Sequence, residues 1–226
     1  MQITEREPRE SARDFATRVL KDNIIHLKLE PGSMVSEHEL AVKLGLSRGP
    51  VREALIELSK VKFVEIYPQR GSYISMVDYE LIDEACFMRE TLEIAVAERC
   101  CLIGVAPNHL AVLRENVKLQ QFYIENDNNQ KFWELDNEFH RTLFLNAGVL
   151  RVHTLMSSML AHFDRVRAMS LALVKKNKLV EDHRLILEAI VCGDTETSKN
   201  LMHKHLTNFK IDKQAICAKY PQYIKQ

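Results

Sequence analysis

Long apolar runs are absent from this sequence of 226 residues. No stretch approaches the roughly 18 consecutive apolar residues that a membrane-spanning helix needs, so we expect no membrane association. The segment from Met1 to Glu10 is polar and mixed in charge, and it lacks the apolar core of a secretory signal. These absences favour a cytoplasmic protein.

An excess of positive charge is also absent. The chain carries 31 basic and 31 acidic side chains, and residues 1–78 on their own are balanced as well. This composition argues against a strongly basic protein that binds nucleic acid without specificity. DNA binding, if present, must come from a local basic face, because that is what attracts phosphates.

Paired cysteine motifs are missing as well. The five cysteines are odd in number, and no two of them form a C-x-x-C pair. Most stand in apolar stretches, which favours small buried side chains in a reducing compartment. A redox sensor or a thiolate metal site is the alternative. The cysteines are Cys86, Cys100, Cys101, Cys192 and Cys217.

The N-terminal third contains clear signals for where helices begin and end. Residues 12–29 have apolar positions at helical spacing, and Pro31-Gly32 ends that segment. Ser36 and Glu39 form a capping box, in which the serine hydroxyl accepts from the backbone N–H of the glutamate. The helix that this box begins ends at Gly45, a residue suited to helix C-termini.

A second short helix and a hairpin follow. Ser47 is placed to cap the helix, and Pro50 falls in its first turn, where no N–H is required. Residues 63–67 and 72–75 have the composition of two strands, joined by a turn at 68–71. Two helices around a short turn, followed by a β-hairpin, predict a winged helix-turn-helix domain over residues 1–77.

The start of the second helix is the predicted DNA-reading element. Such a helix places its N-terminal residues in the major groove. Arg48 and Arg52 lie four apart on one face, and an arginine fork matches the two acceptors of guanine. Ser47 and the first backbone N–H groups suit a phosphate, and Arg70 and Gly71 at the wing suit the adjacent backbone or minor groove. Two arginines on a helix occur on many surfaces, but their place within this order of elements favours DNA binding.

The remainder of the chain shows no strand pattern. We therefore predict a mainly α protein, with three helices and a β-hairpin in the winged domain and an all-α antiparallel bundle over residues 78–226. The bundle has about six helices, expected at 79–104, 107–126, 129–146, 148–171, 176–192 and 194–219.

Asp136 and His140 suggest metal chemistry in this bundle. They are four residues apart, so both side chains project from one helix face and can bind the same ion. His183 and His205 fall on two further helices, and three imidazoles with one carboxylate suit Zn²⁺, Ni²⁺ or Mn²⁺. The chain has nine histidines, however, and spacing alone does not choose among them.

The N-terminal third resembles the GntR family of bacterial regulators. The segment MVSEHELAVKLGLSRGPVREALIEL is similar to that family's helix-turn-helix, and PQRGSYIS is similar to its wing. Gly49 stands where many members have Thr, and His38 stands where some have Arg. The resemblance implies that both positions face DNA, and Gly49 joins the predicted contacts. The operator sequence cannot be inferred from them.

The rest of the chain resembles the FCD effector domain of the FadR subfamily. The matching segments are FMRETLEIAVAERC, LDNEFHRTLF, EDHRLILEAIVCGD and LMHKHL. About six helices place the domain nearer the VanR-like branch. By motif position, the resemblance implies the metal ligands Asp136, His140, His183 and His205, and it favours His205 over His203.

Arg89 has two interpretations. It stands four residues before Glu93, as in an ordinary helix-surface ion pair. The resemblance adds that an arginine here can hold the carboxylate of an effector by its fork. The sequence does not choose between them.

Together these features predict a homodimeric transcription repressor that binds a double-stranded DNA operator. A small organic acid at the metal site would control operator affinity, with release of DNA as the commoner mode in such families. One alternative is a regulator with a purely structural metal. A second is a metal-dependent hydrolase, but Glu138 points away from the Asp136 and His140 face. We therefore predict no catalytic residue.

Overall fold

The computed structural model describes residues 1–170, 176–208 and 213–226. It divides into two compact units. The N-terminal unit comprises Met1–Ile82, Ala161–Ser170 and the described part of Ile211–Gln226. The helical unit comprises Asp83–Leu160 and the described part of Leu171–Lys210. The expected division into residues 1–77 and 78–226 therefore omits two segments that pack with the N-terminal unit.

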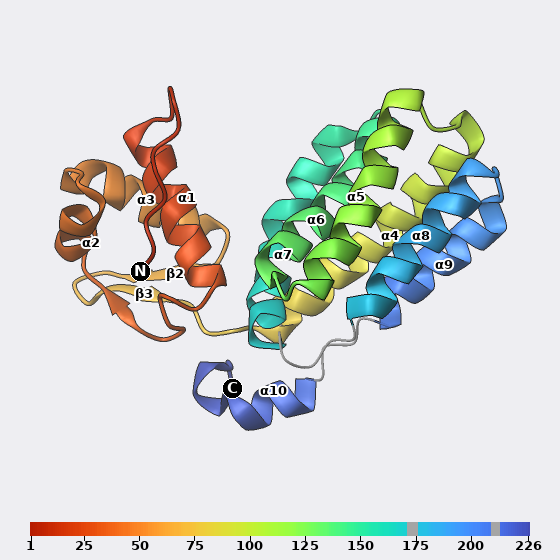
Figure 1. Cartoon of the computed structure of the whole chain (residues 1–226). Coiled ribbons are helices and arrows are strands. Elements are labelled where there is room, and N and C mark those ends of the chain that lie inside the picture. Colours follow the sequence, from red (N-terminus) through yellow and green to blue (C-terminus); the bar gives the residue numbers. More distant parts are fainter. Residues whose placement is uncertain (171–175, 209–212) are drawn as a thin grey trace. The chain divides into compact units, whose positions relative to one another are not determined.

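The N-terminal unit contains the winged helix-turn-helix (Figure 1). The wing is antiparallel, and the sheet has the strand order β1-β3-β2. The two-residue strand β1 is an addition to the predicted hairpin. The elements are α1 (Ala12–Ile25), β1 (Met34–Val35), α2 (Glu37–Leu44), α3 (Arg48–Lys60), β2 (Val64–Tyr67) and β3 (Gly71–Ile74).

The ends of α2 and α3 follow the local signals with one exception. The Ser36 hydroxyl accepts from the Glu39 N–H at 3.4 Å, and Gly45 adopts a left-handed φ of 65° at the C-cap. Ser47 occupies the N-cap of α3, but its side chain makes no capping hydrogen bond. The prediction that Ser47 caps this helix through its side chain is therefore wrong, and Ser47 is exposed.

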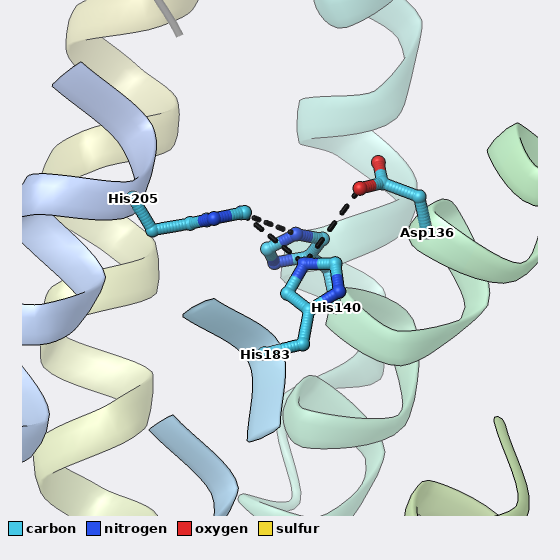
Figure 2. A group of neighbouring side chains, drawn as sticks. All are labelled: Asp136, His140, His183 and His205. Carbon is cyan, nitrogen blue, oxygen red and sulfur yellow. Dashed lines mark hydrogen bonds and ion pairs between the residues drawn. The ribbon is translucent and has the colours of Figure 1, made fainter. Parts of the chain in front are cut away.

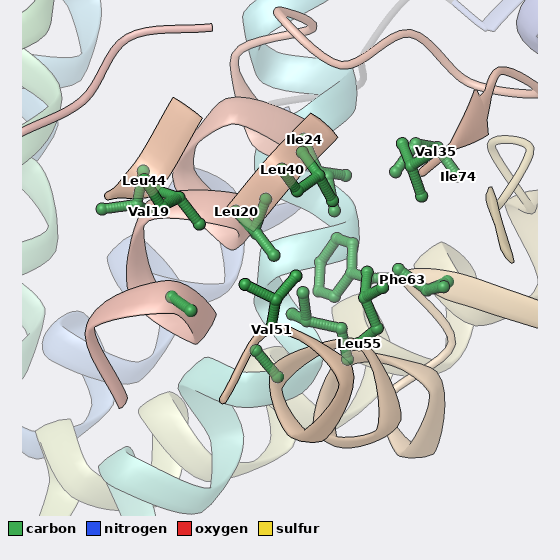
Figure 3. Packing of buried hydrophobic residues seen from close by; sticks show 14 of the residues in the cluster. Val19, Leu20, Ile24, Val35, Leu40, Leu44, Val51, Leu55, Phe63 and Ile74 are labelled. Atoms are coloured by element: carbon green, nitrogen blue, oxygen red, sulfur yellow. The ribbon is translucent and has the colours of Figure 1, made fainter. Parts of the chain in front are cut away.

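One apolar cluster holds the N-terminal unit together (Figure 3). Val51 and Leu55 give α3 its buried face, and α1 packs on α3. Phe63, at the entry to the wing, is also completely buried in this cluster. Each such side chain contributes about 1.5–3 kcal/mol on burial. The cluster therefore holds α3 in place by its buried face and leaves its opposite face exposed.

The last turns of α7 (Leu150–Ser170) complete this unit. The His162 ring stacks on Phe63 with centroids 4.4 Å apart, and its Nε2 lies 2.7 Å from the carbonyl oxygen of Val61. Arg165 is fully buried and donates to the Ser75 carbonyl at 2.7 Å. The end of α3 and the exit from β3 are thereby both held by residues about 90–100 positions later in the chain.

The C-terminal segment also belongs to this unit. It contains α10 (Lys213–Lys219) and a short 3₁₀ helix, η1 (Pro221–Tyr223). The Val77 N–H donates to the Tyr223 carbonyl at 2.8 Å, and the Lys225 N–H donates to the Val77 carbonyl at 2.9 Å. Of the predicted helix 194–219, the part from Lys213 to Lys219 forms α10 in this unit, and residues 209–212 lie outside the described residues.

The helical unit is built from packed helices (Figure 1). Helix α5 packs against α6 and α8, and α8 packs against α9. Residue 171 and residues 209–212, which the predicted helices include, lie outside the described residues. No helix in the described ranges is long and apolar enough to cross a membrane. The new elements are α4 (Tyr79–Ile103), α5 (Pro107–Glu125), α6 (Asn129–Asn146), α8 (Lys176–Val191) and α9 (Thr195–Asn208).

Candidate metal centre and nucleic-acid interface

Three helices of the helical unit bring four potential ligands together (Figure 2). Helix α6 supplies Asp136 and His140 from one face, α8 supplies His183, and α9 supplies His205. All four side chains are buried, and one ligand atom from each lies within 4.8 Å of the others. The sequence could show the pair on α6, whereas only the packing of α8 and α9 brings the other two histidines to it.

The Nε2 atoms of the three histidines face one another. His205 Nε2 lies 3.2 Å from His183 Nε2 and 3.3 Å from His140 Nε2. Asp136 Oδ1 lies 3.6 Å from His183 Nε2. The centre of the cluster is therefore lined by three ring nitrogens and a carboxylate oxygen.

The Nδ1 atom of His183 faces an acceptor. His183 Nδ1 lies 2.8 Å from Gln120 Oε1, and Gln120 uses its own amide N–H groups toward Asn116 and the Leu135 carbonyl. The Gln120 oxygen is thus the acceptor, so His183 must carry its proton on Nδ1. This leaves the Nε2 lone pair directed into the cluster, which is the tautomer that a metal ligand requires.

In the other two histidines, the Nδ1 atom faces a carboxylate. His140 Nδ1 contacts Glu93 Oε2, and His205 Nδ1 faces Asp182 Oδ2 at 3.6 Å. Burial by itself raises the pKa of Glu93, but His140 and Arg89 outweigh it and hold that pKa at about 2. Glu93 is therefore an ionised acceptor, and it orients His140 as Gln120 orients His183.

These residues fit a divalent cation. When each ring is neutral with its proton on Nδ1, all three Nε2 lone pairs point to the centre of the cluster, where a cation can accept them. Burial lowers the pKa of both His183 and His205, which keeps their rings in the neutral form that binds metals. Three imidazoles and one carboxylate are a donor set that Zn²⁺, Ni²⁺ and Mn²⁺ accept.

Arg89 lies beside this cluster through an ion pair. Its Nε donates to Glu93 Oε1 at 2.8 Å, and both side chains are largely buried. Of the two interpretations from sequence, the ion pair is therefore present. This ion pair is largely buried, whereas helix spacing suggested a solvent-exposed pair. Glu93 also contacts His140, so Arg89 is connected to the cluster through Glu93.

His203 lies apart from the cluster. Its ring is exposed and its Nδ1 contacts Glu90 Oε1 at 2.8 Å. Sequence reasoning did not find Gln120 or Asp182, and it placed Glu93 only as a partner of Arg89. Asp182 stands next to His183 in the chain, but Gln120 carries no local signal because it reaches His183 across two packed helices.

The predicted DNA-reading residues on α3 are all exposed. Arg52 Nε lies 3.0 and 3.1 Å from the two carboxylate oxygens of Glu37 on α2. Arg48 Nη2 lies 3.2 Å from His38 Nδ1, also on α2. Gly49 follows Arg48 in the first turn, and no atom lies within 4 Å of the position that a Cβ would take there, so another molecule could approach the backbone closely.

The predicted wing contacts lie at the tip of the hairpin. The Arg70 N–H donates to the Tyr67 carbonyl at 3.1 Å and closes the turn. Gln69 and Gly71 have positive φ values of 62° and 100°. Gly71 suits its position because it adopts such a φ without strain. Arg70 and Gly71 are both exposed.

Comparison with known proteins identifies both parts of the chain. Residues 13–74 match the bacterial regulatory proteins of the gntR family, and residues 84–208 match the FCD domain. The chain belongs to the GntR family. This GntR-family regulator has α4–α9 in the described part of its FCD region, which is consistent with the FadR subfamily and its VanR-like branch.

Relatives of this GntR-family chain are transcription regulators. The HTH-type transcriptional repressor RspR of Escherichia coli (strain K12) is 31% identical over 204 residues, covering 90% of this chain and 89% of that protein. A probable D-xylose utilization operon transcriptional repressor of Paenarthrobacter nicotinovorans is 25% identical, covering 80% of each. These relatives confirm the prediction of a DNA-binding regulator and argue against the metal-dependent hydrolase.

A solved structure confirms the predicted fold of this family member. The Escherichia coli McbR/YncC structure superposes with a TM-score of 0.74 at 21% identity, covering 94% of this chain and 99% of that one. A GntR regulator of Rhodococcus sp. RHA1 gives a TM-score of 0.72 at 24% identity. This chain thus shares the overall fold of these two structures.

Proposed function

We propose that this regulator is a homodimeric repressor whose operator affinity is controlled by a small carboxylate at a metal site in the helical unit. The observation that carries the proposal is the convergence of three Nε2 atoms and one carboxylate oxygen within 4.8 Å, all buried. The orienting contacts of Gln120 and Glu93 on the far side of two rings support it.

Asp136, His140, His183 and His205 would hold the ion, most suitably Zn²⁺, Ni²⁺ or Mn²⁺. A bound divalent ion supplies a Lewis-acid centre that a carboxylate can coordinate. Arg89 is the candidate second contact for that carboxylate.

The DNA half of the proposal rests on the exposed start of α3 and the wing tip. Arg48 and Arg52 would contact base edges, and Ser47 and Gly49 would lie against a phosphate. Arg70 and Gly71 would contact the adjacent backbone or minor groove. In a homodimer each protomer would read one half-site of a roughly palindromic operator in the cytoplasm.

Control of DNA binding requires that the effector distinguish two arrangements of the protein. A ligand shifts an equilibrium only by the difference in its affinity for the two states. We infer that the carboxylate favours the arrangement that binds the operator less tightly. Repression would then be relieved when the acid accumulates.

A structural metal is the second candidate, and the burial of the cluster favours it. Each of the four side chains is less than 5% exposed, so an ion there would join α6, α8 and α9 firmly. The two candidates differ in one respect. A structural metal stabilises the protein without making operator affinity depend on any carboxylate.

An operator titration separates them. We expect a panel of small carboxylates to weaken binding of metal-loaded protein to a duplex selected in vitro from a random pool, and to have no effect after chelation. A panel that leaves operator affinity unchanged in the metal-loaded protein, while chelation lowers its melting temperature, would establish the structural role.

The DNA-reading role has its own test. Substitution of Arg52→Ala should weaken binding to the selected duplex by on the order of 1–3 kcal/mol, because one base contact is lost. Fluorescence anisotropy measures the change. Arg13→Ala is the control, since Arg13 is an exposed arginine paired with Asp14 on α1. Equal affinities for the two variants would remove Arg52 from the contacts.

A further inference from the structure

The first turn of α2 contacts both arginines of the DNA-reading helix. Arg52 Nε lies at hydrogen-bond distance from both Glu37 oxygens, at 3.0 and 3.1 Å. The Arg52 side chain is 67% exposed and that of Glu37 30% exposed. An ion pair so open to solvent contributes little to folding stability, so stability does not explain why a carboxylate stands in a face that meets DNA.

We propose that Glu37 is a positioning residue that sets sequence specificity, by orienting Arg52 toward base edges and by opposing contacts with phosphate. This inference rests on the proposed base-reading role of Arg52. Glu37 does not itself bind phosphate, because both groups are negatively charged acceptors. Its proposed function in DNA discrimination is exerted through Arg52.

The first effect is on geometry. Arginine has a long, flexible side chain, and a guanine is read only when the plane of the guanidinium lies in the plane of the base. Glu37 engages the Nε side of Arg52 and thereby fixes that plane. The two Nη groups of Arg52 can then donate two parallel hydrogen bonds to guanine O6 and N7.

The second effect is electrostatic. Attraction to phosphates is independent of sequence and makes up most of non-specific binding. A free Arg52 could turn toward a phosphate on any DNA. When Arg52 is held by Glu37, the same movement either breaks the ion pair or brings the carboxylate toward the phosphate. Glu37 therefore penalises the wrong contact more than the correct one, which is how discrimination is increased.

Glu39 offers a matched control in the same turn of α2. It is exposed and carries the same charge. In the described structure, no hydrogen bond or ion pair joins its side chain to Arg48 or Arg52. Glu37→Gln and Glu39→Gln therefore remove the same charge from the same turn, but only the first removes the ion pair that holds Arg52.

The experiment measures affinity for two probes at fixed salt. One is the duplex selected from a random pool by the unmodified protein, and the other is the same duplex with its sequence shuffled. For Glu37→Gln we expect the ratio of the two affinities to fall about tenfold, largely through tighter binding of the shuffled duplex. For Glu39→Gln we expect the ratio to change less than about twofold, because lost charge alone acts on both probes.

A double-mutant cycle connects the effect to Arg52. In an Arg52→Ala background, Glu37→Gln should leave the affinity ratio unchanged. Glu37→Asp, which keeps the charge but shortens the reach, should lower the ratio in the wild-type background. Equal melting temperatures of the variants exclude a folding effect.

The outcomes are distinguishable. Equal changes of the ratio in Glu37→Gln and Glu39→Gln, with Arg52→Ala still losing operator affinity, would overturn the role of Glu37 and leave the base-reading role of Arg52 in place. An Arg52→Ala variant with unchanged affinity for both probes would overturn both.

Discussion

Removal of metal by a chelator should lower the melting temperature of this regulator by roughly 8–16 °C. An ion held at a thousand times its dissociation constant stabilises the folded state by about 4 kcal/mol, and each kcal/mol is worth roughly 2–4 °C in a domain of this size. The physical reason is local. The ion would join ligands on three helices, α6, α8 and α9, so its removal takes away a connection between them.

Two histidines on one helix provide the control for this effect. His205 lies in the cluster, whereas His203 is exposed on α9 and contacts Glu90. His203→Ala should retain the full response to chelator in differential scanning fluorimetry. His205→Ala should melt near the temperature of chelated wild-type protein and should not respond further. A chelator response that survives in His205→Ala would place the ion elsewhere.

Arg165→Ala should destabilise the N-terminal unit by about 3–5 kcal/mol, because it leaves a cavity and an unpaired buried carbonyl. Arg165 is completely buried, and it donates to Ser75 through both the carbonyl oxygen and the hydroxyl. Its guanidinium carbon also lies 5.8 Å from the centre of the Phe63 ring. Burial lowers the pKa of Arg165 to about 10, so the group remains charged at neutral pH.

Hydrogen exchange measures this loss where it occurs. Amides of α3 and β3 should exchange about a hundred to several thousand times faster in Arg165→Ala, since each 1.4 kcal/mol is a factor of ten. Arg151→Ala is the matched control, because Arg151 is an exposed arginine on the same helix. Unchanged exchange in α3 would show that the end of α7 does not support α3.

The winged helix could be predicted because its signals are local. Ser36 and Gly45 mark the two ends of α2 directly, and the hairpin turn is equally short. The first helix ends at Ile25, earlier than the predicted segment 12–29 and before the Pro31-Gly32 pair. Strand β1 was missed because two residues carry no periodicity. The contacts of Arg165 and Tyr223 with residues 75–77 join segments about 90 to 146 positions apart, and no pattern near either segment announces them.

The candidate metal site was only partly accessible to the same reasoning. The spacing of Asp136 and His140 is a helical signal, but the choice of His183 and His205 depended on resemblance to a family. Gln120 shows why the remainder was hidden. Its oxygen faces His183 only because α5 packs beside α8, and glutamine on an amphipathic helix ordinarily indicates nothing more than a solvated face.

Metal content is the most direct test of the central claim. Elemental analysis of purified, tag-free protein should give close to one divalent ion per chain for the wild type and for His203→Ala. The His205→Ala variant should give far less. Equal metal content in all three proteins, or none in the wild type, would contradict a metal centre at Asp136, His140, His183 and His205, and the evidence for DNA binding would then stand alone.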